Sequence, residues 1–401
     1  MRKVIFLVAD GMGDYPVESL GYKTPLEVAD TPFLDELAGQ SIVGRCRTIP
    51  HGMPKGSDIA NMSLLGYDPV KFYTGRGPIE AVAQGVNCAS EDLIFRLNLC
   101  TISEFSANGV MIDYSADHIE TKKAHELIGI LKKEIKLPDV DFVPGFQYRH
   151  LMIQKKGALK IESKLLINPP HDIINKPIKD DFLLYKRSPF LYKIMKSAYE
   201  ILKSVKNSTK ANAIWLWGQG PPISLDPFEE KFRMKGCVIS AVDLIKGLGY
   251  AAKMKVIEVQ GATGLLDTNY RGKAEAVIEF LEKGGDFAYL HLEAPDECGH
   301  HADIDGKIKA IENFDKEIIG TLIDFIKKEK VLCVITCDHF TPVSIRTHTS
   351  DPVPFLVFDP KNKVNSGLSS FDERKALKSD IFIERGSDLL KWIIEYLECK
   401  R

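Results

Sequence analysis

The sequence predicts an α/β protein built on a mostly parallel sheet. Three runs of β-branched and other apolar residues, at 4–9, 287–292 and 331–336, have the unbroken hydrophobic pattern that is typical of buried parallel strands. After residue 189, helix and strand patterns alternate to the end of the chain, which is the usual order in α/β proteins. With 401 residues, 44% of them hydrophobic, the chain can form two or three compact units and bury a sizeable core.

Two helix starts are marked by a hydroxyl residue followed by proline. Thr31 is the expected N-cap of a helix that begins at Pro32, because proline is favoured at the first helical position. Ser188 and Pro189 open a longer helix in the same way. The apolar face of this helix consists of Leu191, Ile194, Met195, Ala198, Ile201 and Leu202.

The pattern changes between about residue 105 and residue 185. Helical spacing runs from Thr121 to Ile135, and the segment 148–153 has the composition of a strand. The stretch 168–181 is rich in proline and aspartate and leads back to the main body. We therefore expect a core made of residues 1–105 and 185–401, with an inserted α+β cap at 106–184.

Charge and composition exclude several kinds of partner. The 53 basic and 55 acidic residues give a formal net charge of -2, so nothing predicts binding to nucleic acid or to an anionic membrane. Only six apolar residues precede Asp10, too few for a signal peptide or a membrane span. The eight cysteines lack the spacing of a disulfide framework, which suits a reducing cytoplasm.

Residues of the types that commonly bind metals follow each of the three apolar runs. Asp10 comes directly after the first run, and Asp296-x-x-x-His300 follows the second, in what we expect to be a turn containing Gly299. The pair Asp338-His339 follows the third run. Because the carboxyl ends of parallel strands meet at one edge of a sheet, these side chains are expected to lie together. Carboxylates and imidazoles bind divalent ions, so the pattern predicts a two-metal site for phosphoryl transfer.

Each segment also has a simpler interpretation when it is taken alone. Asp296 is then a helix cap with His300 at the surface, and Asp338-His339 is a capped turn. His348, in a loop further on, is then an ordinary surface histidine. Four such segments that all fall beyond strand ends favour the metal site.

A serine at the start of a helix supplies a candidate nucleophile. In the segment 54–61, a glycine precedes Ser57, and the helix that follows runs through Leu65. A helix N-terminus favours an anion, so Ser57 is well placed to become a phosphoserine, and a metal contact would activate its hydroxyl. The alternative is that Ser57 is only an N-cap. Arg76, between two glycines, resembles a phosphate loop weakly, and we expect it to have a structural or supporting role.

These motifs together resemble one family over nearly the whole chain. The similarity is to the cofactor-independent phosphoglycerate mutases of the archaeal type, within the alkaline phosphatase superfamily. The segments that carry it are 8–14, 54–69, 261–264, 293–300 and the pair Asp338-His339.

The resemblance implies an alkaline-phosphatase-like core and a ligand set for two divalent ions. One ion would be held by Asp10, Ser57, Asp338 and His339, and the second by Asp296, His300 and His348. Ser57 would be the nucleophile that is phosphorylated. The mixed oxygen and nitrogen ligands suit Mn²⁺ best, with Zn²⁺, Co²⁺ and Mg²⁺ as alternatives.

The chain departs from the family pattern where the substrate would bind. Segment 113–118 replaces an arginine-rich stretch of the family, and Trp217 stands where the family has arginine. Phosphoglycerate carries a phosphate and a carboxylate, which bidentate arginine recognises well. The remaining candidates for substrate contact are Arg149 and its neighbour His150, and more weakly Lys55 and Arg76.

The expected function is the interconversion of 3- and 2-phosphoglycerate through a phosphoserine. A subgroup that resembles this chain has been proposed to act as homoserine kinase, which is the first alternative. A metal-dependent phosphomonoesterase is the second, and a metal-stabilised binding module without turnover is a third. The expected partner is a small phosphorylated substrate. The sequence leaves the oligomeric state, the metal and the choice of substrate open.

Overall fold

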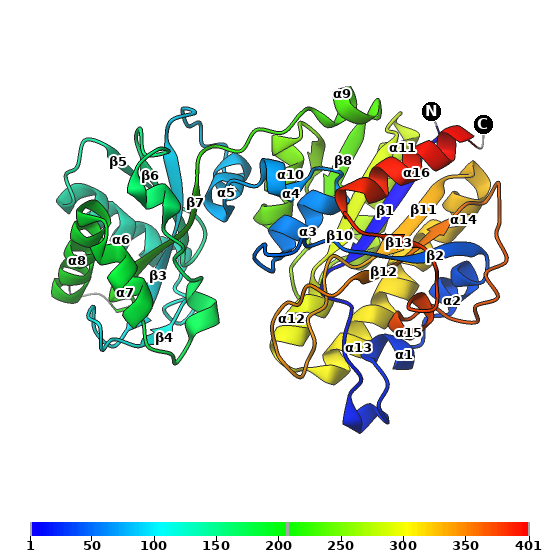
Figure 1. The fold of residues 1–401 in the computed structure, drawn as a ribbon, viewed down its shortest axis with the longest axis horizontal. Coiled ribbons are helices and arrows are strands. Elements are labelled where there is room, and N and C mark those ends of the chain that lie inside the picture. The colour runs from blue at the N-terminus through cyan, green and yellow to red at the C-terminus, as the bar shows by residue number, and fades with distance from the viewer. Residues whose placement is uncertain (1, 206–207, 400–401) are drawn as a thin grey trace. The chain divides into compact units, whose positions relative to one another are not determined.

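The structure divides into two compact units. It is a computed structural model that describes residues 2–205 and 208–399. Unit 1 consists of residues 1–73 and 224–401, and unit 2 of residues 74–223 (Figure 1).

Unit 1 is built on one sheet, whose strands follow the order β13-β2-β12-β11-β1-β10-β8-β9. The sheet is mostly parallel: only the pairs β11–β12 and β12–β2 are antiparallel. The strands are β1 (Val4–Ala9), β2 (Ser41–Cys46), β8 (Gly236–Ile239), β9 (Lys255–Ile257), β10 (Phe287–Leu292), β11 (Leu332–Thr336), β12 (Val353–Phe358) and β13 (Phe382–Ile383). The predicted α/β fold with a mostly parallel sheet is confirmed.

The three predicted apolar runs form adjacent strands at the centre of this sheet. Strand β1 pairs in parallel with β10 on one side and with β11 on the other, and every residue of the three strands is buried. Burial on both faces explains why the runs are mostly apolar rather than alternating. Their carboxyl ends lie at the same edge, where Asp10 and Asp338 follow β1 and β11.

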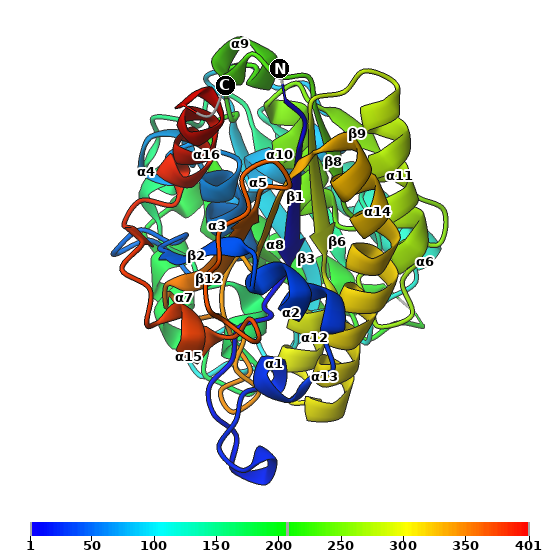
Figure 2. The ribbon, with the colours of Figure 1, turned by 90° about the vertical axis from the view of Figure 1, so that its right-hand side faces the viewer.

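Helices cover both faces of the sheet of unit 1. Figure 2 shows α11, α13 and α14 on one side of β1, with α3, α10 and α16 on the other. The helices are α1 (Pro25–Val28), α2 (Pro32–Ala38), α3 (Ser57–Leu64), α4 (Pro69–Phe72), α9 (Phe228–Phe232), α10 (Asp243–Ala251), α11 (Tyr270–Glu282), α12 (Ala294–His300), α13 (Ile304–Asn313), α14 (Gly320–Glu329), α15 (Glu373–Ala376) and α16 (Ser387–Cys399), with a 3-10 turn at Glu18–Leu20 and a π-helical turn at Phe314–Ile319.

Unit 2 contains a second sheet that is antiparallel throughout. Its strands are β3 (Leu93–Ile102), β4 (Met111–Asp113), β5 (Val140–Val143), β6 (Arg149–Gln154) and β7 (Ala213–Gly220). Strand β3 pairs with β4, β6 and β7. The helices are α5 (Arg76–Ala83), α6 (Thr121–Glu134), α7 (Lys179–Lys186) and α8 (Pro189–Ser204), with 3-10 turns at Ile161–Lys164 and Pro170–Ile173.

This inserted α+β unit is larger than the segment 106–184 expected from the sequence. The difference arises because β3 and β7, more than a hundred residues apart, are hydrogen-bonded to each other and thus belong to one sheet. Helix α8, expected in the core, packs on β7 and on α6. Long-range pairing of this kind leaves no mark on local composition.

Helix α2 begins where it was predicted, but its cap comes from a distant residue. Thr31 holds the N-cap position and Pro32 follows it, yet the Thr31 side chain makes no cap hydrogen bond. Instead the buried Asp315, on the π-helical turn, accepts hydrogen bonds from the backbone N–H of Leu34 at 2.6 Å and of Phe33 at 3.3 Å. Burial raises the pKa of the Asp315 carboxyl to about 6.

Asp315→Ala is expected to lower the free energy of unfolding by about 1–2 kcal/mol, because two N–H groups at the helix start lose their acceptor. Urea unfolding measures the change. The control is Asp324→Ala, at an exposed position of α14. Equal stability of the two variants would show that Asp315 does not cap α2.

The raised pKa of Asp315 also predicts that the stability of the protein depends on pH. Because its pKa is raised, the folded protein binds this proton more tightly than the unfolded chain does. The resulting stability is fully present below the unfolded pKa of about 4 and is lost as the pH rises through about 6. Wild type should therefore lose stability over this range relative to Asp315→Asn.

Candidate metal centre

Asp10, Asp338 and His339 form the first cluster at the edge of the central sheet. The His339 Nε2 atom lies 3.3 Å from Asp10 Oδ1 and 3.4 Å from Asp338 Oδ2. The hydroxyl of Ser57, the first residue of α3, lies 3.0 Å from the same nitrogen. Asp10, Asp338 and His339 are buried, and Ser57 is half-buried. Four donor atoms of ligand type therefore converge from three separate stretches of chain.

Backbone and amide groups fix the Asp338 carboxylate in this cluster. Its Oδ1 atom accepts hydrogen bonds from the backbone N–H of Gly11 at 3.1 Å and of His339 at 2.9 Å. Its Oδ2 atom accepts from the side chain of Asn61 at 2.8 Å, which also donates to the Ser57 carbonyl. Asn61 thus connects the candidate nucleophile to a candidate ligand.

Asp296, His300 and His348 form the second cluster. Asp296 Oδ2 lies 3.2 Å from His300 Nε2, and Asp296 Oδ1 lies 3.4 Å from His348 Nε2. The two Nε2 atoms are 3.0 Å apart. The expected turn containing Gly299 is wrong: residues 294–300 form helix α12, and the four-residue spacing places Asp296 and His300 on one face of it.

The two clusters are close neighbours. The rings of His339 and His348, one from each cluster, have centroids 4.1 Å apart. The Thr341 hydroxyl donates a hydrogen bond to Asp296 Oδ1 and lies 3.2 Å from His339 Nδ1. Gly11 has a φ of +60°, and a Cβ there would come within 2.6 Å of Asp296 Oδ1 and of the Thr341 hydroxyl, so only glycine fits between the clusters.

The electrostatics of these residues fit two divalent cations. Burial, together with the charges of Asp338 and Asp296, raises the pKa of Asp10 well above its usual range. Among the described residues, Asp10 Oδ1 has no hydrogen-bond partner. Burial opposes the charged form of His300, but the neighbouring Asp296 carboxylate raises the pKa of this imidazole to about 9. Cations would remove the repulsion between carboxylates and provide a partner for Asp10 Oδ1.

Three of the four candidate substrate residues belong to unit 2, and the fourth, Lys55, belongs to unit 1. Lys55 is exposed, two residues before Ser57. In unit 2, Arg149 is exposed, and its guanidinium donates to the Tyr148 hydroxyl at 2.8 Å. His150 is completely buried, its Nδ1 accepts a hydrogen bond from the Gly145 N–H, and burial lowers its pKa to about 3.

Arg76 is the first residue of α5 and forms an ion pair within that helix. It contacts the buried carboxylate of Glu80 at 3.1 Å, and Arg96 contacts the same carboxylate at 2.7 Å. The guanidinium groups of both arginines lie over the Trp217 ring, at 5.5 and 5.0 Å from its centroid. Trp217 therefore occupies a place that is already rich in positive charge.

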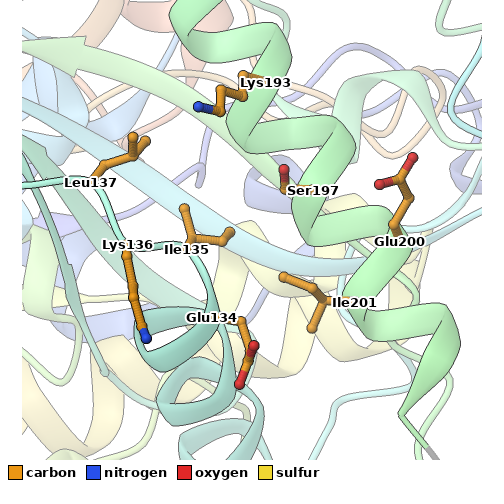
Figure 3. Close-up of a pocket in the computed structure, with 8 residues that line it drawn as sticks. All are labelled: Glu134, Ile135, Lys136, Leu137, Lys193, Ser197, Glu200 and Ile201. Carbon is orange, nitrogen blue, oxygen red and sulfur yellow. The ribbon is translucent and has the colours of Figure 1, made fainter.

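One cavity of unit 2 contains none of the predicted site residues. It lies between the end of α6 and helix α8 (Figure 3). Its lining residues are Glu134, Ile135, Lys136, Leu137, Lys193, Ser197, Glu200 and Ile201. Acidic and basic side chains both line it, so it has no marked charge preference.

Sequence reasoning missed several polar residues around the clusters. Asn61 and Thr341 lie close in sequence to predicted ligands, and this proximity could have identified them as residues of the site. His291 is an ionisable residue within the otherwise apolar strand β10, and its presence there could have identified it as a functional residue. Lys273 and Lys307 lie on α11 and α13 and are completely buried, although the sequence gives no sign of it.

The fold and the paired clusters define a metal-dependent enzyme of the metalloenzyme superfamily, whose family model matches residues 2–382. A 2,3-bisphosphoglycerate-independent phosphoglycerate mutase of Methanosarcina barkeri is 43% identical over 403 residues, covering 98% of this chain and 99% of the relative. The chain therefore belongs to the 2,3-bisphosphoglycerate-independent phosphoglycerate mutase family, as the sequence motifs predicted.

Two solved structures are similar over almost their whole length. A protein of Pyrococcus horikoshii is 29% identical with a TM-score of 0.78, over 99% of this chain and 97% of that one. A cofactor-independent phosphoglycerate mutase of Thermoplasma acidophilum is 25% identical with a TM-score of 0.63, over 99% and 100%. Within residues 2–205 and 208–399, no helix is long and apolar enough to span a membrane.

Metal-free protein is expected to bind two Mn²⁺ ions per chain, because two separate ligand clusters are present. Asp296→Ala should reduce the stoichiometry to one. The matched control is His301→Ala, which removes the exposed imidazole beside His300. Calorimetric titration and elemental analysis measure the ions. Two ions bound to Asp296→Ala would contradict the second cluster.

Proposed function

We propose that this chain interconverts 3- and 2-phosphoglycerate through a phosphoserine at Ser57, with two Mn²⁺ ions bound in the metal centre. The observation that carries the proposal is the position of the Ser57 hydroxyl, 3.0 Å from His339 Nε2 at the start of α3. The name of the Methanosarcina barkeri relative supports the same reaction.

The ligand set proposed for the ions follows the two clusters. Asp10, Ser57, Asp338 and His339 would hold one ion, and Asp296, His300 and His348 the other. When bound, the ions supply positive charge for the serine oxygen and the phosphoryl oxygens. Oxygen and nitrogen ligands in this mixture suit Mn²⁺, and Zn²⁺, Co²⁺ and Mg²⁺ are the alternatives.

Ser57 carries the phosphoryl group between the two hydroxyls of the glycerate. In the first half-reaction the Ser57 oxygen bonds to phosphorus, the bond from phosphorus to the C3 oxygen breaks, and the glycerate receives the proton that serine loses. In the second half-reaction the C2 oxygen bonds to phosphorus, the bond from phosphorus to the Ser57 oxygen breaks, and serine regains the proton that the C2 hydroxyl loses. The N-terminus of α3 favours the negative charge of the phosphoserine.

Arg149 is the residue of unit 2 that we propose for recognition of the substrate. It is exposed, and its planar guanidinium can bind a carboxylate or phosphate in a bidentate manner. Lys55 is an exposed second candidate. His150 and Arg76 are not proposed as substrate contacts, because His150 is buried and Arg76 is paired with Glu80.

The names of the relatives favour the mutase over transfer from ATP to homoserine and over simple hydrolysis. Phosphorus NMR separates the three reactions, because the mutase yields 2-phosphoglycerate, the kinase yields phosphohomoserine and ADP, and hydrolysis yields inorganic phosphate. Cytoplasmic location is also proposed, since the eight cysteines are free thiols, as in a reducing compartment.

Ser57→Ala is expected to lower the conversion of 3- to 2-phosphoglycerate by several orders of magnitude, because a nucleophile that acts as part of a unit is lost. Phosphorus NMR measures the conversion, and mass spectrometry of quenched wild type should detect one phosphoryl group on Ser57. Circular dichroism controls for folding. Substantial turnover by a folded Ser57→Ala variant would refute the covalent route.

Arg149→Lys is expected to lower kcat/KM by about ten- to a hundred-fold, because lysine cannot make the bidentate contact. The number of bound ions should not change. The matched control is Arg187→Lys, at another exposed arginine of unit 2. Equal kinetics of the two variants would remove Arg149 from the proposed substrate site.

A further inference from the structure

A buried histidine lies directly behind the carboxylates of the first cluster. His291, on β10, has no exposed surface, and its Nε2 atom is 3.4 Å from Asp10 Oδ2 and 3.9 Å from Asp338 Oδ2. It approaches the Oδ2 atom of Asp10, whereas the Oδ1 atom is the one near His339. In the part of the chain that the structure describes, Asp10 Oδ1 and both ring nitrogens of His291 are buried without a hydrogen-bond partner. The two oxygens of Asp10 thus have separate surroundings.

The other side of the His291 ring faces a fixed carboxylate. Its Nδ1 atom lies 3.5 Å from Glu293 Oε1. That oxygen accepts hydrogen bonds from the Ser240 hydroxyl at 2.7 Å and from the Ala241 N–H at 2.6 Å. Glu293 Oε2 pairs with the ammonium of Lys273 at 2.5 Å. The carboxylate therefore has partners on both oxygens and little freedom to rotate.

Lys273 completes a chain of buried groups that ends at the cluster. Its ammonium also donates to the His291 carbonyl at 3.0 Å. Lys273 is completely buried, and Glu293 is 2% exposed. A buried ion pair is often no more stabilising than apolar residues of the same size, so this arrangement calls for a role beyond stability.

We infer that His291 is a positioning residue for the first metal cluster, oriented by Glu293 and Lys273. Its ring would hold Asp10 by the Oδ2 atom and leave Oδ1 directed at the ion. Histidines and carboxylates behind a metal ligand commonly act in this way, and their loss lowers metal affinity about 10- to 100-fold. The inference rests on the proposed metal centre but not on the identity of the substrate.

The test is a calorimetric titration of metal-free full-length His291→Gln with Mn²⁺. One of the two binding steps should weaken about 10- to 100-fold and the other should keep its wild-type affinity. Excess Mn²⁺ should restore most of the lost kcat with KM unchanged. Wild-type affinity at both steps, or equal weakening of both, would overturn the inference.

Two further variants complete the test. The double variant Lys273→Met with Glu293→Gln removes both buried charges together and should weaken the same binding step. If His291→Gln does not fold, this double variant tests the inference in its place. Arg2→Met breaks an ion pair with buried Asp359, which follows β12 at the opposite edge of the sheet, and should leave both steps unchanged. If wild type bound no Mn²⁺, the proposed centre and this inference would both fail, whereas two bound ions without mutase activity would overturn the reaction alone.

Discussion

The structure depends on one electrostatic constraint, which is that three buried aspartates lie close together at one edge of a sheet. Asp10, Asp296 and Asp338 are all less than a tenth exposed, and burial together with the charges of the other two raises the pKa of Asp10. Carboxylates held together in this way are unfavourable unless positive charge is near. In the second cluster, the Asp296 carboxylate raises the pKa values of His300 and His348 against the effect of burial, so these imidazoles provide positive charge while no ion is bound. Divalent ions would take their place, because an imidazole binds a metal in its neutral form.

Two buried lysines neutralise acidic groups that surround the clusters. Lys273 pairs with Glu293, and Lys307 pairs with Asp14 at 2.7 Å. The Lys307 ammonium also donates to the carbonyls of Gly13 and Thr341. It therefore connects the loop after Asp10 with the loop after His339, which carry ligands of different strands. Complete burial of both ammonium groups is costly, so we attribute their presence to the rigidity that a metal centre needs.

The proposed metal ligands and the proposed nucleophile all belong to unit 1. The residues of both clusters, and Ser57, belong to unit 1, where parallel strands fix them on the sheet edge. Unit 2 is an antiparallel sheet in which Trp217 lies under the guanidinium groups of Arg76 and Arg96. Both guanidinium groups also contact the single buried carboxylate of Glu80, so their positive charge is only partly neutralised.

The sequence by itself determined the central strands, the positions of the ligand residues after them, and the start of helix α2 at Pro32. These features follow from local composition, since a strand buried on both faces is mostly apolar along its length. Only the tertiary structure decided that Asp315 caps α2, that His291 lies behind Asp10, and that the inserted unit spans residues 74–223. Each of these depends on contacts between segments far apart in the chain, and such contacts have no local pattern in the sequence.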